Sequence, residues 1–197
     1  ALLLLTAGSA VAVDGFWVGR GSQPYNQAIW GGLANWNPSG QLANGVDATA
    51  YFTNTFVNGY YSFYNVTRTI GNIWFTDPAN ANDFTVAVSS GNNVMTLQVS
   101  SGFPTMNVTQ PERTLTVQTI IAGTQGLVKI GPGTLVLTNA NTYTGSTVVS
   151  NGTLKLATAS YATTAVIVNG GTTIDVLVTG TGGQLTIPGP WTNADNS

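Results

Sequence analysis

The sequence predicts an all-β parallel β-helix, a solenoid whose coils each add strands to shared sheets. Three observations lead to this prediction. Short runs rich in Thr and Val recur along the 197 residues, and long helix-forming stretches do not. Asn-Gly pairs, which tolerate positive φ and so mark tight turns, stand at 44–45, 58–59, 151–152 and 169–170. From residue 84 onward, apolar strands repeat with a period near 19, which is typical of one coil per repeat.

Composition narrows the function classes before any motif is considered. Charged residues make up 6% of the chain, about a quarter of the usual share, and the net charge is −2. The sequence contains no basic run, so we expect no nucleic-acid partner. His and Cys are both absent, which removes imidazole and thiol catalysis, the common zinc sites and any disulfide. We therefore expect no cofactor and no enzymatic activity.

Residues 1–13 form an uncharged apolar N-terminal segment. They are too few to span a bilayer as a helix, so no membrane span is expected. The segment could be the tail of a signal peptide, because small residues at 8–12 resemble a cleavage site. We favour a retained strand. Leu2 to Leu5 would then show apolar groups on both faces, and burial would favour a partner by roughly 1.5–3 kcal/mol per leucine.

Residues 14–83 form an aromatic-rich section, with 14 of the 19 aromatic residues of the chain. Short strands are predicted at 48–54, 60–67 and 70–76, between Gly, Pro and Asn turns. Two interpretations stay open for its aromatic cluster. Buried, it would cap the solenoid, whose ends must be covered. Exposed, it would stack on sugar rings, with these residues as the candidates: Trp17, Tyr25, Trp30 and Trp36. We expect the cap.

Residues 84–190 are expected to form the coils, and residues 191–197 a C-terminal tail. Strands are predicted at 84–88, 95–99, 114–117, 134–137, 153–156 and 173–176. Each of the last five predicted strands contains a Thr followed by a large aliphatic residue, and these aliphatic residues recur at spacings of 18, 20, 19 and 20. These residues, which we expect to stack in one inward row, are Leu97, Leu115, Leu135, Leu154 and Ile174. Thr, Lys155 and Asp175 should face outward, and the Asn turns should form hydrogen-bonded ladders.

One segment carries a family resemblance. Residues 126–157 read GLVKIGPGTLVLTNANTYTGSTVVSNGTLKLA, which closely resembles the autotransporter-associated β-strand repeat. The matching positions are Gly126, Leu127, Lys129, Gly131, Gly133, Thr134, Leu135, Leu137, Asn141, Tyr143, Gly145, Thr147, Gly152, Thr153 and Leu154. The upstream section is also similar to the lead-in of such proteins, at Trp30, Asn35-Trp36 and residues 47–52.

The resemblance implies a right-handed parallel β-helix on a bacterial cell surface or in secreted matrix. It implies structural roles for the repeat residues and carries over no catalytic residue. An autotransporter also needs a C-terminal membrane barrel, for which residues 189–197 leave no room. We therefore expect a protein that uses the repeat for another purpose, rather than a passenger fragment.

The function we predict is that of a non-enzymatic extracellular structural protein, a subunit of a fibre or matrix. Unpaired strand edges at the ends of a β-helix can template association, and head-to-tail strand addition gives a filament. The partners would be further copies of the chain. The expected subunit contacts are Leu2, Leu3, Leu4, Leu5, Val11 and Val13.

The alternative is a passenger-type cell-surface adhesin or a carbohydrate-binding module, whose partner would be a surface polysaccharide. An enzyme is disfavoured because the acids are few, and we expect Asp77 and Asp83 to cap turns rather than to act as a catalytic pair. The Glu112–Arg113 pair should be a surface ion pair of little energetic value. A calcium loop of the Asp-x-Asn-x-Asn-Gly type is absent, so no metal site is expected.

Overall fold

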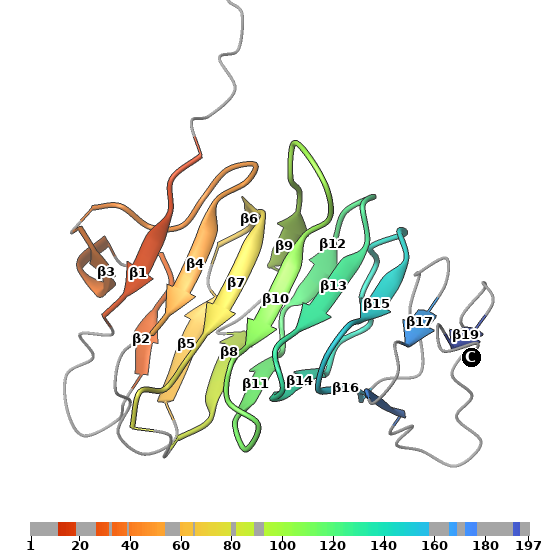
Figure 1. Cartoon of the computed structure of the whole chain (residues 1–197). Coiled ribbons are helices and arrows are strands. Elements are labelled where there is room, and N and C mark those ends of the chain that lie inside the picture. The colour runs from red at the N-terminus through yellow and green to blue at the C-terminus, as the bar shows by residue number, and fades with distance from the viewer. Residues whose placement is uncertain are drawn as a thin grey trace, which may run out of the picture.

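The chain winds repeatedly through three β-sheets (Figure 1). The computed structural model describes residues 12–18, 27–31, 33–38, 40–53, 60–64, 66–79, 82–88, 93–157, 166–168, 172–176 and 191–193. Neighbouring strands in these sheets are parallel, apart from one antiparallel pair at the N-terminal end, β1 with β3. The prediction of an all-β parallel solenoid is confirmed. Its right-handed sense came from the family resemblance and stays a prediction.

Sheet 1 is the longest sheet, and its strands lie side by side in Figure 1. In spatial order it contains β3 (Trp36–Asn37), β1 (Gly15–Trp17), β4 (Thr49–Phe52), β7 (Asn72–Phe75), β10 (Thr105–Val108), β13 (Leu127–Ile130), β15 (Thr147–Val149), β17 (Val166–Val168) and β19 (Trp191–Asn193). A short 3-10 helix, η1 (Leu33–Asn35), precedes β3.

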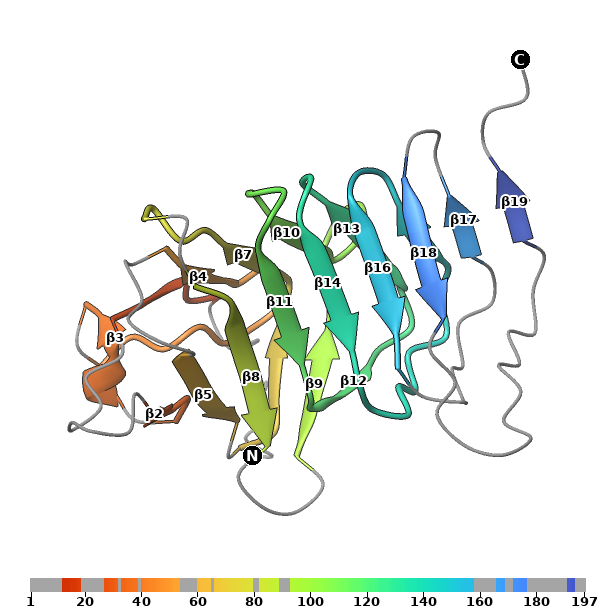
Figure 2. The ribbon, with the colours of Figure 1, turned by 90° about the horizontal axis from the view of Figure 1, so that it is seen from below.

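Sheet 2 continues the coils, sheet 3 adds a strand to the coils that begin at β4, β7 and β10, and both sheets are visible from below in Figure 2. Sheet 2 contains β2 (Gln27–Ile29), β5 (Tyr60–Tyr64), β8 (Phe84–Val88), β11 (Thr114–Val117), β14 (Thr134–Leu137), β16 (Thr153–Leu156) and β18 (Thr173–Val176). Sheet 3 contains β6 (Arg68–Ile70), β9 (Val94–Leu97) and β12 (Ile120–Ala122). The coils that begin at β4, β7 and β10 therefore run from sheet 1 through sheet 2 to sheet 3 and back, whereas among the described residues those that begin at β13, β15 and β17 have strands in sheets 1 and 2 alone.

The inward row of sheet 2 corrects one sequence prediction. Leu115, Leu135, Leu154 and Ile174 are Cα partners in successive strands, as predicted. Leu97 does not join them, because it lies in β9 of sheet 3, opposite Ile70. The residue next to Leu115 is Phe84 of β8. Alternation of apolar and polar residues identified the strands, but not which of the three sheets each strand enters.

Coil length explains that error. The step along the chain from Phe84 to Leu115 is much longer than the step from Leu115 to Leu135 or any later step of the row. The coil that begins at β7 is long enough to place a separate strand, β9, between β8 and β10. The period near 19 holds for the later coils alone.

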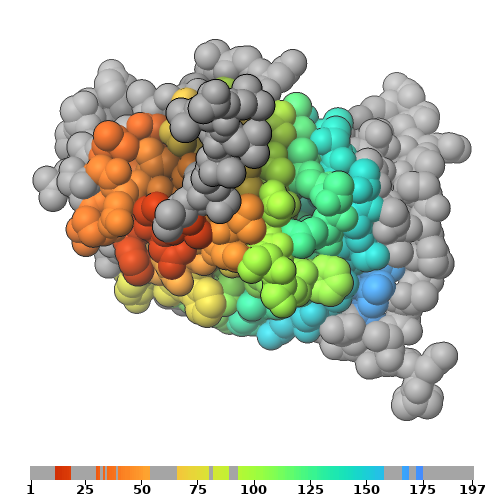
Figure 3. Space-filling view, turned by 90° about the horizontal axis from the view of Figure 1, so that it is seen from above, coloured from red at the N-terminus to blue at the C-terminus, as the bar shows by residue number. Residues whose placement is uncertain are grey.

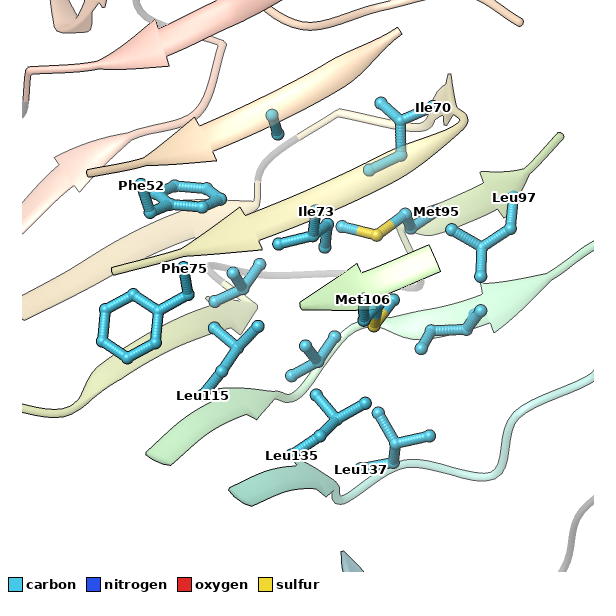
Figure 4. Close-up of a cluster of buried hydrophobic side chains, with 14 of the residues drawn as sticks. Phe52, Ile70, Ile73, Phe75, Met95, Leu97, Met106, Leu115, Leu135 and Leu137 are labelled. Carbon is cyan, nitrogen blue, oxygen red and sulfur yellow. The ribbon is translucent and has the colours of Figure 1, made fainter. Parts of the chain in front are cut away.

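A single apolar core fills the space between the sheets (Figure 4). Strand β14 shows the pattern that produces it, because Leu135 and Leu137 are buried while Thr134 and Val136 are half-buried on the other face. Burying each such leucine stabilises the fold by about 1.5–3 kcal/mol. Side chains from all three sheets meet there, including Ile73 of sheet 1 and Met95 of sheet 3.

Aromatic side chains replace aliphatic ones in the core near β1. Trp17, Trp30 and Trp36 are buried, with exposures of 0%, 0% and 1%. Trp36 packs edge-on against both other indoles, with ring centroids 5.0 Å apart, and Phe52 lies within 5.3 Å of Trp30. The Nε1 of Trp36 donates to the carbonyl of Trp30 at 2.6 Å. The three indoles are therefore buried and not exposed for stacking, while the role of this section as a cap stays a prediction.

The sheets continue across the expected boundary between residues 83 and 84. Strands β4 and β5 pair directly with β7 and β8, so the aromatic-rich section contributes coils to the same solenoid. At the other end, Trp191–Asn193 of the expected tail pairs with β17 in sheet 1. Figure 3 shows the same order on the surface, where the coils follow one another in sequence along the molecule.

Glycine is required where coils touch at their corners. Gly131 has φ of +77°, and a Cβ there would overlap the carbonyl oxygen of Val108 in the preceding coil. Gly152, from one of the predicted Asn-Gly turns, has φ of +73° and stacks on the backbone of residues 131–133. Positive φ and this close approach both exclude a side chain.

The predicted asparagine ladders exist in a different form. Asn139 donates through Nδ2 to the carbonyl of Gln118 at 3.0 Å, and Asn141 accepts through Oδ1 from the Ile121 amide at 2.7 Å. Each side chain bonds the backbone of the preceding coil, not another asparagine. Asn169 lies outside the described residues.

Candidate binding surface

The indoles predicted as alternative stacking residues face the core. Trp17, Trp30 and Trp36 have no exposed ring face because each is at most 1% exposed. A sugar cannot reach them in this packing, so the geometry does not support stacking at these three positions. Tyr25 lies outside the described residues. The inward direction follows from strand alternation, since Trp17 shares its face with the buried Gly15 and not with Phe16.

A different set of aromatic residues lies on the outer face of sheet 1. Phe16 of β1, Tyr51 of β4 and Trp74 of β7 are Cα partners in three neighbouring strands. Phe16 and Trp74 are 45% and 41% exposed. Phe16 stacks on Tyr51, with centroids 4.5 Å apart and planes 9° apart. Tyr51 and Trp74 are 6.5 Å apart and tilted by 38°.

Beside this aromatic row runs a polar row, made by Thr49, Asn72 and Thr105 of β4, β7 and β10. Asn72 links its neighbours. Its Nδ2 donates to Thr49 Oγ1 at 3.4 Å, and its Oδ1 accepts from the Thr105 amide at 3.1 Å. The Thr105 hydroxyl donates to the carbonyl of Phe103 at 3.1 Å. The row is thereby held in register across three coils.

The two rows line a hollow of about 260 Å³, which we call the sheet 1 hollow. Its lining residues are Thr49, Tyr51, Asn72, Ile73, Trp74 and Thr105. None of these residues was predicted from the sequence as a stacking position. Alternation in Asn72–Phe75 could have shown Trp74 facing outward, because Ile73 and Phe75 share the opposite face. At Phe16-Trp17, where both residues are aromatic, alternation alone cannot tell which one is exposed.

The acidic residues serve the turns. Asp77 is buried, and its carboxylate accepts from the amides of Ala79 at 3.1 Å and Asn82 at 2.7 Å. Asp83 accepts from the Thr114 amide at 2.8 Å and lies 3.7 Å from Arg113. This geometry confirms the turn-capping prediction for Asp77, whereas Asp83 bonds the backbone of the next coil at the start of β11. Within the described ranges, no three acidic side chains come together as metal ligands.

Glu112 and Asp47 lie at the surface. Glu112 is a surface ion-pair partner of Arg113, at 4.0 Å and with a side chain 77% exposed. Asp47 has φ of +70°, and it accepts from the Ser100 amide at 2.7 Å. Hydrogen bonds from the side chain and the backbone of Ser100 lower the pKa of the Asp47 carboxyl. The contact ties the turn before β4 to the loop that follows β9.

Lys129 is the unexpected ionisable group of the core. It alternates with Val128 and Ile130 in β13, so it points inward with Leu127 and is fully buried. Its Nζ donates to the carbonyls of Ile130 at 2.9 Å, Gly131 at 2.7 Å and Asn151 at 3.1 Å. Burial lowers the pKa of Lys129 to about 8. The ammonium joins the corners of two successive coils, which gives this repeat residue a structural role.

Tyr143 is a second buried polar residue of the repeat. Its hydroxyl lies 2.8 Å from Thr147 Oγ1, and the ring is 1% exposed. Burial raises the pKa of Tyr143 to about 12, partly offset by the Thr147 hydrogen bond. Tyr143 and Lys129 are both buried, and their polar groups bond within the fold.

The expected subunit contacts fall mostly outside the described residues, as Leu2, Leu3, Leu4, Leu5 and Val11 do. Val13 is described, and its amide and carbonyl both bond Asn44 of the same chain, each at 3.0 Å. The backbone groups that strand addition would use at this residue are engaged within the chain. No helix in the described ranges has both the length and the apolarity of a membrane span.

Comparison with known proteins agrees with the geometry. Residues 127–156 match the family model of the passenger-associated-transport-repeat, which confirms the resemblance found in the sequence. A curated relative is the "Adhesin BmaC autotransporter" of Brucella suis biovar 1 (strain 1330), 34% identical over 154 residues. That alignment covers 75% of this chain, and the chain spans only 4% of the length of the relative. No solved structure matches.

These comparisons favour the adhesin alternative over the fibre prediction. The relative is named an adhesin, and the matched repeat covers β13 to β16. No observation among the described residues supports filament assembly. Contact between copies of this chain stays a prediction from the sequence.

Proposed function

Because the chain carries a passenger-associated transport repeat and is distantly related to an autotransporter adhesin, we propose that it is a passenger-type segment of a bacterial surface adhesin. In this role the solenoid is a non-enzymatic stalk that holds a binding face away from the cell. The observation that carries the proposal is the 34% identity to the adhesin across 75% of the chain.

The fold is physically suited to that role. Consecutive coils add length through strand pairing between adjacent coils, because each described strand pairs with strands of neighbouring coils alone. The core is continuous from Trp17 to Leu156, so the stalk has no internal break in packing along this stretch. The small number of charged residues limits salt-dependent, non-specific attraction, so specific contacts on an outer face would decide adhesion.

The experiment is display of the chain on a non-adherent laboratory bacterium, fused to a heterologous outer-membrane anchor. We expect displaying cells to bind an epithelial monolayer or its extracellular matrix several-fold more than cells that display the anchor alone. Antibody labelling of intact cells must show equal surface amounts.

A matched control tests whether the folded solenoid is needed. Leu135→Ala removes a buried core side chain, whereas Val136→Ala changes a half-buried residue on the outer side of the same strand. Adhesion should fall with the first variant and persist with the second. If the displayed wild-type chain does not raise adhesion, the proposed function is wrong.

A further inference from the structure

The aromatic row and the polar row that line the sheet 1 hollow offer different chemistry to a ligand. Tyr51 and Trp74 supply aromatic faces, and Phe16 supports Tyr51 from the side away from Trp74 through its 4.5 Å stack. An aromatic face is electron-rich and attracts the polarised C–H groups of an apolar ligand face. The aromatic row is thus suited to a ligand that has one face of C–H groups.

The polar row offers hydrogen-bonding groups that are only partly used within the chain. One hydrogen of the Asn72 amide bonds Thr49 Oγ1, which leaves the second Nδ2 hydrogen for a ligand. The Thr105 hydroxyl donates to Phe103, and its oxygen keeps lone pairs that can accept. A ligand with hydroxyl groups around its edge can therefore donate and accept here at the same time.

The charge and the volume of the hollow restrict the class of ligand further. The lining residues include no Lys or Arg, and the Asp14 carboxylate accepts from the amide of the lining residue Thr49 at 2.6 Å, so the hollow disfavours an anionic ligand. Its volume of about 260 Å³ is slightly below the range of about 300–1,000 Å³ that is usual for drug-sized ligands. One ring of a longer molecule fits such a space, with the remainder lying across the open face.

Strand addition of a peptide does not suit this place. Strands β4, β7 and β10 each have a parallel neighbour on both sides in sheet 1, so their backbone groups already form the ladder. Peptide recognition by strand addition needs a free sheet edge. A ligand in the hollow must instead be recognised by side chains.

We propose that the sheet 1 hollow binds one ring of a neutral glycan, which packs its C–H face on Tyr51 and Trp74 and places its hydroxyl groups on Thr49, Asn72 and Thr105. The proposal rests on the adhesin function above and names the ligand class of that function. It moves the stacking role from the buried indoles to the exposed row of β4 and β7.

The test uses the purified chain and immobilised hexasaccharides of glucose, mannose and N-acetylglucosamine, with polygalacturonate as the acidic probe. We expect saturable binding to at least one neutral probe and none to polygalacturonate. Trp74→Ala and Tyr51→Ala should each weaken that binding at least tenfold, and Trp74→Phe should retain most of it. Circular dichroism and the thermal midpoint show whether each variant is folded.

Phe103→Ala is the matched control, because Phe103 is 58% exposed and does not line the hollow. It should bind as wild type does. The proposal is overturned if no neutral probe binds, if polygalacturonate binds more tightly, or if folded Trp74→Ala binds unchanged.

The two proposals fail in different ways. If displayed cells adhere and Trp74→Ala cells adhere equally well, the adhesin function holds and the glycan site is wrong. If displayed wild-type cells do not adhere but the purified chain binds a neutral probe through Trp74, the site holds and the adhesin function is wrong.

Discussion

Replacing Lys129 with methionine tests whether the buried lysine is desolvated and titrates at a lowered pH in the folded chain. The side chain is fully buried and donates to the carbonyls of Ile130, Gly131 and Asn151. Methionine has a similar length but no charge and no donor. The substitution therefore removes both the desolvation penalty and the three hydrogen bonds, and the pH dependence of stability separates these effects.

The direction in which stability changes with pH follows from the lowered pKa of Lys129. Burial lowers the pKa of Lys129 from 10.5 to about 8, so between these pH values the unfolded chain binds the proton that the folded chain has lost. The free energy of unfolding then rises with pH across this interval. A pKa difference of this size corresponds to roughly 3 kcal/mol, fully present above pH 10.5 and lost as pH falls through 8.

The assay is urea unfolding, followed by the fluorescence of the buried indoles, at several pH values from 7 to 11 and constant ionic strength. The difference between wild type and Lys129→Met should grow by roughly 3 kcal/mol in favour of wild type between pH 8 and 10.5. Lys155→Met, which removes a lysine from an exposed position of β16, controls for net charge. A difference that stays constant across this range would refute a buried, titrating Lys129.

Three further predictions concern stability. Leu135→Ala should lower the free energy of unfolding by about 2–5 kcal/mol in urea titrations, because it empties a core position, while Val136→Ala should cost clearly less. Gly131→Ala should lower the thermal midpoint more than Gly102→Ala, since both have φ of +77° but only Gly131 contacts another coil; equal effects would contradict the close packing. The raised pKa of Tyr143 stabilises the fold below pH 10, and this contribution is lost as pH rises through 12, so the free energy of unfolding of the wild type should fall between pH 10 and 12. Tyr143→Phe should abolish that fall in urea titrations. If the fall persists in the variant, another group causes it.

Local pattern was enough to predict the class of fold and many of its strands. Strands 84–88, 114–117, 134–137, 153–156 and 173–176 were predicted with the bounds that the structure shows. Alternation and glycine corners act within one coil, so they are visible in the sequence. Strands such as β10 and β13 were missed. In β13 a lysine occupies an inward position, and alternation cannot reveal a buried charge whose partners include a carbonyl of the next coil, that of Asn151.

The candidate site could not be predicted in the same way. The chain is rich in aromatic residues near its N-terminal end, and this composition alone suggested both a cap and a stacking surface. Which ring faces outward depends on strand register, and which rings become neighbours depends on coil length. Tyr51 and Trp74 are separated by a whole coil in sequence but are partners in adjacent strands.

The sequence by itself determined a repeating, nearly uncharged β-solenoid and its kinship to passenger repeats, because alternation, turn glycines and the repeat motif are local properties. The tertiary structure alone decided three things: the number of sheets, the row to which Leu97 belongs, and the aromatic residues that reach the surface. The physical reason is that coils of unequal length still pair their strands in register, so the position of a strand along the chain does not fix which sheet it enters. Periodicity in the sequence does not encode that choice.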